Sequence, residues 1–140
     1  MNQTARKIQS PRYAGVQASF AAKRISLGFM ELLESQFPVT NLMSTLQLRS
    51  ASDFAQQLNI HVNHLNRTVK ATFNKPTTAV IRERVLAESK RLLTQIDWNV
   101  SEVAYALGFT EVTHFNNFFK KETNMNPSQY RKSLGHTKDT

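Results

Sequence analysis

Apolar residues recur at helical spacing along most of this chain. In the segment 17–37 the recurring positions are Phe20, Ile25, Phe29, Leu32 and Leu33. Because Pro38 follows and a proline cannot continue a helix, this pattern predicts a helix that ends before it. The same period predicts further helices at about 50–58, 61–73 and 77–95, two more within 99–122, and a short one at 127–134. We therefore predict an all-α fold.

Capping residues mark several of these helix boundaries. Three capping boxes are predicted: Ser50 with Asp53, Asn99 with Glu102, and Asn126, followed by Pro127, with Gln129. We expect Thr110 to cap the helix after Gly108, since its hydroxyl can accept a hydrogen bond from the first turn. Asn74 and Asn124 are expected to end their helices in the left-handed conformation, which asparagine tolerates better than any residue except glycine.

Two segments of the chain repeat one pattern. They are FAQQLNIHVNHLNRTVK (54–70) and VAYALGFTEVTHFNNFFK (103–120). In each, a small alanine (Ala55 or Ala104) lets two helices cross closely, and a turn residue (Asn59 or Gly108) permits a positive φ. This pattern is typical of a helix-turn-helix, whose second helix fits a DNA major groove about 12 Å wide. The sequence therefore predicts two such subdomains, at about 50–73 and 99–122, joined by the long helix at about 77–95.

The second helix of each predicted subdomain carries side chains suited to DNA. Amide and guanidinium groups pair with base edges and methyl groups contact thymine, so the candidate base-reading residues are Asn63, Asn66, Arg67, Val112, Thr113, Asn116 and Asn117. The candidate phosphate contacts are Lys70, Lys120, Lys121 and Arg131. Any one of these residues also fits a solvated polar face. The duplicated context favours DNA contact for the groups as a whole.

The composition supports a polyanionic partner. The chain has 140 residues, with 18 Lys and Arg against 10 Asp and Glu, and a net charge of +8. This favours double-stranded DNA; the alternative is a helical interaction module that binds an acidic partner protein. No apolar run approaches the roughly 18 residues that span a membrane, so we expect no membrane contact. The absence of cysteine suits a reducing cytoplasm, where we expect the protein to be located.

Catalytic and metal chemistry find little support in the sequence. His61 and His64 have a spacing that could share a metal, but no third ligand of the usual kind is near them. Neither a phosphate-binding glycine loop nor a nucleophile motif occurs. We therefore expect no enzyme, no metal and no cofactor.

The segment LLTQIDWNVSEVAYALGFTEVTHFNNFFKKETNMNPSQYR (92–131) resembles the signature of AraC/XylS-type bacterial transcription regulators. The positions in register are Ala104, Gly108, Phe109, Phe115, Phe119, Lys120, Pro127, Tyr130 and Arg131. The likeness extends back to about Ser50, and His61 stands where the family commonly has a capping serine. The resemblance implies an AraC-type DNA-binding domain at 17–140, with both second helices in major grooves on one face of the DNA. It also suggests RNA polymerase as a partner.

The family resemblance also bears on the rest of the chain. Members usually carry a separate effector or dimerisation domain, and 140 residues leave no room for one. Residues 1–16 resemble a tail or interdomain linker, since Pro11 and Gly15 interrupt a helical pattern there. We therefore expect a truncated regulator rather than a minimal one.

The predicted linker helix has a length that suits DNA. About 18 residues of helix span roughly 27 Å. Successive major grooves on one face are about 34 Å apart. If the second helices sit closer together than the grooves, the DNA must bend.

Overall fold

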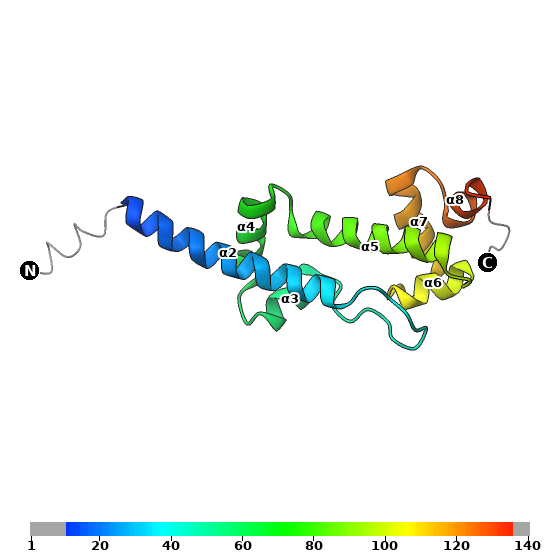
Figure 1. Ribbon diagram of the computed structural model, residues 1–140, viewed down its shortest axis with the longest axis horizontal. Coiled ribbons are helices and arrows are strands. Elements are labelled where there is room, and N and C mark those ends of the chain that lie inside the picture. Colours follow the sequence, from blue (N-terminus) through cyan, green and yellow to red (C-terminus); the bar gives the residue numbers. More distant parts are fainter. Residues whose placement is uncertain (1–10, 136–140) are drawn as a thin grey trace, which may run out of the picture.

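The computed structural model describes residues 11–135, which fold into helices (Figure 1). The helices are α2 (Pro11–Ser35), α3 (Ala51–Gln57), α4 (Val62–Phe73), α5 (Thr77–Gln95), α6 (Val100–Ala106), α7 (Val112–Thr123) and α8 (Pro127–Ser133). The predicted all-α fold is therefore confirmed.

Two helix pairs lie at opposite ends of α5 (Figure 1). We call α3 and α4, with α2 packed against α4, the first unit, and α6 and α7, with α8 beside α7, the second unit. The core of the first unit contains Phe29, Leu33, Phe54, Ala55, Leu65, Val69 and Ile81. The core of the second unit includes Leu92, Leu93, Val100, Val103, Ala104, Phe115 and Phe119. The predicted pair of helix-turn-helix subdomains joined by a long helix is thus present.

The helix α2 begins earlier than the sequence pattern predicted. It starts at Pro11 and includes Gly15, so residues 11–16 are helical rather than part of a tail or linker. A proline has no N–H to lose at the first position of a helix, and its fixed φ suits that position. The rest of the predicted tail, residues 1–10, lies outside the described residues, as do residues 136–140.

Most of the predicted capping residues are confirmed. The three capping boxes are present at α3, α6 and α8. Asn74 and Asn124 end α4 and α7 with φ of 58° and 67°. The role predicted for Thr110 is wrong, because the cap of α7 is Glu111, which makes no side-chain capping hydrogen bond. The connection 107–111 is one residue longer than the equivalent connection 58–61, and this moves the helix start past Thr110.

The connection between α2 and α3 ties the two units together. Val39 and Leu46 are buried in the core of the second unit, although their segment leads into the first. The Leu46 N–H donates to the carbonyl oxygen of Ala106 at the end of α6 (3.3 Å). Gln36 Oε1 accepts from the Leu48 N–H (2.8 Å) and holds the two ends of the connection together. The core of the second unit is therefore completed by residues that precede the first helix-turn-helix.

A buried carboxylate on α5 anchors the same connection. Glu88 is 2% exposed, accepts from the Val39 N–H (2.7 Å) and pairs with Arg91 (2.8 Å). Arg91 also donates to the Val39 carbonyl oxygen (2.9 Å). Burial by itself would raise the pKa of Glu88, but the hydrogen bonds from Arg91 and Val39 outweigh it and hold that pKa below its ordinary value. The linker helix thus holds the connection through an ionised group.

Candidate nucleic-acid interface

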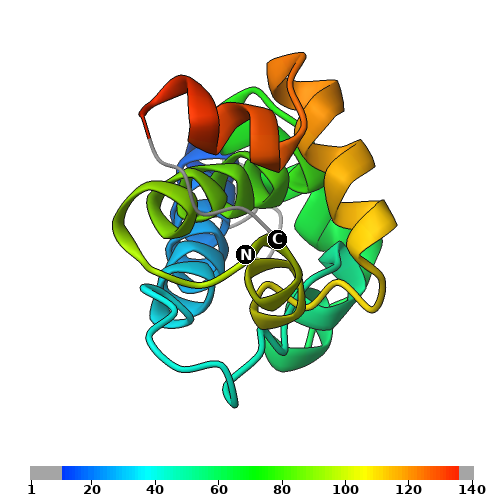
Figure 2. The ribbon, with the colours of Figure 1, turned by 90° about the vertical axis from the view of Figure 1, so that its right-hand side faces the viewer.

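The helices α4 and α7 are equivalent in the two units. Each has 12 residues, begins with a valine (Val62 or Val112) and ends at an asparagine cap. One face of each is buried, through Leu65, Thr68 and Val69 in α4 and through Phe115 and Phe119 in α7. Viewed along the long axis of the molecule, α7 lies on the side away from α2 (Figure 2). The unburied faces of α4 and α7 form two similar surfaces.

The turn before each of these helices contains the same hydrogen bond. The Ile60 N–H donates to the carbonyl oxygen of Ala55, and the Phe109 N–H donates to that of Ala104, each at 3.0 Å. Both alanines are buried, as a close helix crossing requires. The left-handed turn residues are Asn59 (φ 57°) and Gly108 (φ 92°). The two turns therefore have the geometry that the repeated sequence pattern predicted.

Most of the predicted contact residues lie on the two outward surfaces. The exposed ones are Asn63, Asn66, Arg67 and Lys70 in α4 and Thr113, Asn117, Lys120 and Lys121 in α7. Val112 and Asn116 are partly buried. Val112 lies three residues before the buried Phe115, and Asn116 lies three residues before the buried Phe119, which places both at the edge of the buried face. We define the recognition surface as the exposed residues named here.

Sequence reasoning missed two exposed histidines that lie on the same two helices as the recognition surface. His64 in α4 and His114 in α7 occupy matching positions, and both side chains are exposed. An imidazole can donate or accept a hydrogen bond at a base edge or a phosphate. Alignment of the two helices on Val62 and Val112 would have found the pair. His61 has a different role, because its Nδ1 accepts a hydrogen bond from the first turn of α4 (3.1 Å) and caps that helix.

The predicted phosphate contact at Arg131 is wrong. Its side chain is 2% exposed, and its Nε donates to the carbonyl oxygen of Leu93 (2.9 Å). Arg131 lies on the inner face of α8, where it binds the end of α5 instead of projecting into solvent. Its role is to hold α8 against the linker helix.

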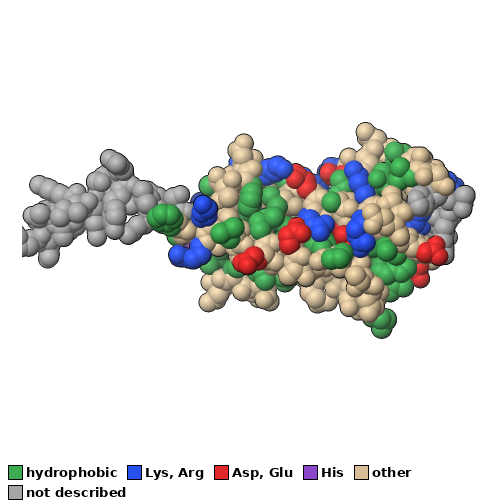
Figure 3. Space-filling model, in the orientation of Figure 1, with side chains coloured by type: hydrophobic (Ala, Val, Ile, Leu, Met, Phe, Trp, Pro, Cys, Tyr) green, Lys and Arg blue, Asp and Glu red, His purple; other side chains and the backbone are tan. Residues whose placement is uncertain are grey.

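The recognition surface is well suited to the DNA backbone because the helices α4 and α7 themselves contain almost no acidic residues. The helix α4 contains no acidic residue, and the one acid within α7, Glu122, pairs with Arg82 of α5 (3.2 Å). Lys70, Lys120 and Lys121 lie in the last turns of the two helices. The face that carries α2 differs, since Figure 3 shows Lys and Arg interspersed with Asp and Glu there. Lysines without competing acids are the usual partners of phosphates.

The described part of the chain shows neither a metal-binding cluster nor a membrane-spanning helix. No group of three or more His, Cys, Asp or Glu in residues 11–135 is placed to hold a metal ion. None of the described helices combines the length and apolar character that a membrane-spanning segment needs.

A protein-family model matches more than half of this chain. The model, described as a helix-turn-helix domain, matches residues 54–133. The chain is 32% identical over 69 residues to the xylose operon regulatory protein of Haemophilus influenzae, across 49% of this chain and 18% of that protein. It is 24% identical over 140 residues to the transcriptional activator RhaS of Salmonella heidelberg, across 94% of this chain and 50% of that one. The chain spans half or less of the length of these two relatives.

Solved structures share the fold. One is a transcriptional regulator of Chromobacterium violaceum with an AraC-type DNA-binding domain, at 19% identity and a TM-score of 0.61, covering 81% of this chain and 94% of that one. Another is the DNA-binding domain of the global transcriptional factor AdpA in complex with a target DNA, at 18% identity and a TM-score of 0.61, covering 76% and 92%. The fold and the matched model define a helix-turn-helix DNA-binding protein. The chain belongs to the AraC-type family of transcription regulators.

Proposed function

We propose that α4 and α7 enter successive major grooves of double-stranded DNA, read its sequence there and so regulate transcription. The observation that carries this proposal is the duplication of one exposed surface, polar and basic, on two equivalent helices of one chain. The proposed base-reading residues are Asn63, Asn66, Arg67, Val112, Thr113, Asn116 and Asn117, joined by His64 and His114. The proposed phosphate contacts are Lys70, Lys120 and Lys121.

The linker helix sets the spacing of the two contacts. The 19 residues of α5 correspond to about 28 Å of helix, while successive major grooves on one face of B-DNA are about 34 Å apart. We propose that α4 and α7 are separated by about the length of α5, which is shorter than the groove repeat, so that bound DNA bends toward the protein. Part of the specificity then comes from how readily a sequence bends.

The relatives support a bacterial regulatory setting. The names of RhaS and of the xylose operon protein describe regulators of transcription. We therefore propose that this chain acts on promoter DNA in the bacterial cytoplasm, with RNA polymerase as a second partner and without an enzymatic activity of its own.

Fluorescence anisotropy with labelled duplexes at about 50 to 200 mM salt tests the proposal. We expect the logarithm of the affinity to fall linearly with the logarithm of salt concentration, and some duplexes to bind at least about a thousandfold more tightly than random DNA. Lys120→Ala should make the salt slope shallower by about one, because one phosphate contact is lost. The matched control is Lys23→Ala, since Lys23 is exposed on α2.

A flat salt dependence, together with one affinity for every duplex, would contradict the proposal. That result would favour the alternative function, a helical module that binds an acidic protein.

A further inference from the structure

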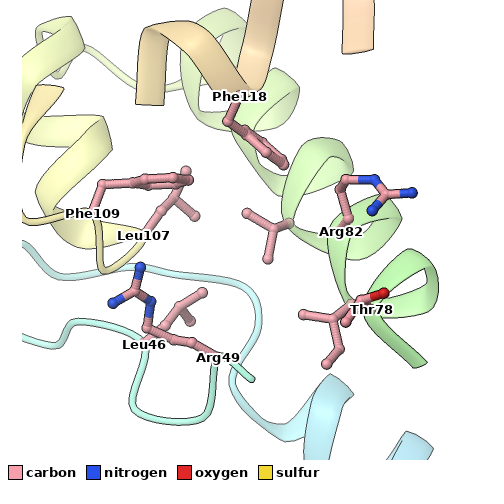
Figure 4. Close-up of a pocket in the computed structure, with 9 residues that line it drawn as sticks. Leu46, Arg49, Thr78, Arg82, Leu107, Phe109 and Phe118 are labelled. Atoms are coloured by element: carbon pink, nitrogen blue, oxygen red, sulfur yellow. The ribbon is translucent and has the colours of Figure 1, made fainter. Parts of the chain in front are cut away.

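An apolar hollow of about 220 Å³ lies between the two units (Figure 4). Its walls come from the connection before α3, from the linker helix α5, and from the turn and second helix of the second unit. The apolar lining residues are Leu46, Ile81, Val85, Leu107, Phe109 and Phe118. A cavity of about 150 Å³ lined by apolar side chains can hold a benzene molecule. This hollow therefore has room for one six-membered ring and a small substituent.

Two arginines border the hollow, and no acidic residue lines it within the described part of the chain. In Figure 4, Arg49 lies on the side of Phe109 and Arg82 on the side of α5. The Arg49 guanidinium carbon is 5.7 Å from the centre of the Phe109 ring. Arg82 is engaged with Glu122 (3.2 Å), whereas no described carboxylate lies within ion-pair distance of the Arg49 guanidinium. The rim of an apolar space thus carries a guanidinium without a direct ion-pair partner among the described residues, with Asp53 as its nearest electrostatic neighbour.

The side chain of Arg49 lies against Gly108. A Cβ atom at Gly108 would lie 2.8 Å from both Cδ and Nε of Arg49, so the absence of a side chain there makes room for the arginine. Gly108 also has a φ of 92°, which excludes most other residues. The turn of the second unit therefore leaves room for the exposed guanidinium beside the hollow.

We propose that this hollow binds a small carboxylate that carries one apolar ring. The ring packs between Phe109, Phe118 and Val85, and the carboxylate accepts hydrogen bonds from Arg49, whose planar donors match a carboxylate in geometry. Apolar walls supply the affinity, and the arginine selects the anion over a neutral molecule of the same shape. This inference rests on the fold and does not depend on DNA binding.

The test is a titration of the ¹⁵N-labelled chain with cyclohexanecarboxylate, followed by NMR. We expect saturable shifts of the backbone amides of Thr78, Phe109 and Phe118, with a dissociation constant on the order of 1 mM for so small a ligand. Cyclohexanecarboxamide, which has the same shape without the charge, should bind at least about tenfold more weakly.

Variants separate the contribution of the charge from that of the shape. Arg49→Gln should weaken binding of the carboxylate about tenfold and leave binding of the carboxamide unchanged. Its matched control is Arg24→Gln, at an exposed position of α2. Thr78→Phe, which fills the hollow from its exposed rim, should weaken both ligands. The spectrum of each variant shows directly whether it is folded.

Several results would overturn the inference. One is the absence of saturable shifts at cyclohexanecarboxylate concentrations up to about 20 mM. Others are equal affinity for the carboxylate and the carboxamide, or an equal loss of carboxylate affinity in Arg24→Gln and Arg49→Gln. A further one is that the shifts are confined to the outward faces of α4 and α7. The last result would mean that the carboxylate binds the recognition surface as a simple anion.

Discussion

Arg67 and Asn117 occupy the same position in the two recognition helices, five residues after the first valine of each, and both are exposed. A guanidinium pairs best with guanine and an amide with adenine. The base pair that faces Arg67 should therefore differ from the base pair that faces Asn117, although the two residues lie at equivalent positions of their helices.

Arg67→Ala should lower discrimination at one or two base pairs of the bound site. The expected cost is about 1 to 3 kcal/mol on the preferred duplex if the contact is bidentate, with a much smaller change on random DNA. Anisotropy titrations with the preferred duplex and its single-base variants measure the difference, with Arg24→Ala on α2 as the control. An equal loss of affinity on preferred and random DNA would show that Arg67 binds only the backbone.

Glu88→Gln should destabilise the fold and reduce its dependence on pH. At pH 7 the expected loss in the free energy of unfolding is about 2 to 3 kcal/mol, since Arg91 loses its partner while remaining 28% exposed. The pKa of Glu88 is lowered on folding from 4.5. Its contribution is therefore present above that value and is lost as the pH falls through the folded-state pKa.

Urea unfolding followed by circular dichroism at pH 7 and at about pH 3 measures this effect. The difference in the free energy of unfolding between wild type and Glu88→Gln should be smaller at the lower pH. A difference of the same size at both pH values would show that the ionised form of Glu88 does not contribute to stability.

The sequence shows the chemical type of the candidate contact residues but not always the direction in which each side chain points. The sequence predicts that Lys70 and Lys120 are exposed cations, and both are exposed, because each lies on a helix with an obvious buried stripe. Arg131 has the same charge but lies in a short helix of seven residues with little periodicity, so its inward direction could not be inferred. The buried side of the short helix α8 is determined by its packing against α5.

The ends of α4 and α7 are fixed by asparagines in the left-handed conformation. Asn124→Ala should lower stability by about 1 kcal/mol, because a Cβ-bearing residue without a local hydrogen-bonding side chain is strained at a φ of 67°. Asn124→Gly should be neutral or slightly stabilising, since glycine adopts this conformation freely. Thermal unfolding of the two variants provides the comparison, and equal stability of the alanine and glycine variants would contradict the conformational explanation.

The helices themselves could be predicted from the sequence because each has strong periodicity and a marked end. The helix boundaries are harder to predict where the same residue type can either begin a helix or follow its end. Pro11 begins a helix, whereas Pro38 follows the end of one, and the residue type alone does not distinguish these cases. The extra residue in the connection 107–111 likewise displaced the cap expected at Thr110.

The two units should unfold together because Leu46 and Val39 belong to the core of the second unit. Leu46 is 6% exposed, so Leu46→Ala should cost about 2 to 4 kcal/mol. Met43→Ala, on the same connection but 89% exposed, is the matched control and should change stability little. Urea unfolding followed both by the fluorescence of Trp98, in the second unit, and by circular dichroism should give one coincident transition. Two separate transitions would show that the units are independent.

This sharing of the connection between the two units could not have been predicted from the sequence. The segment 36–50 has no helical periodicity, and nothing in it indicates that Leu46 packs against α6 rather than α3. On the proposed function this sharing matters, because it would give α4 and α7 a defined spacing.

Selection from a pool of duplexes with about 30 randomised base pairs, at near-physiological salt, tests this spacing most directly. The structure predicts two short enriched elements about one helical turn apart, one for each recognition helix, and a weaker preference for easily bent steps between them. A single enriched element, or two elements at no fixed separation, would contradict the view that one chain reads two grooves through a rigid linker helix.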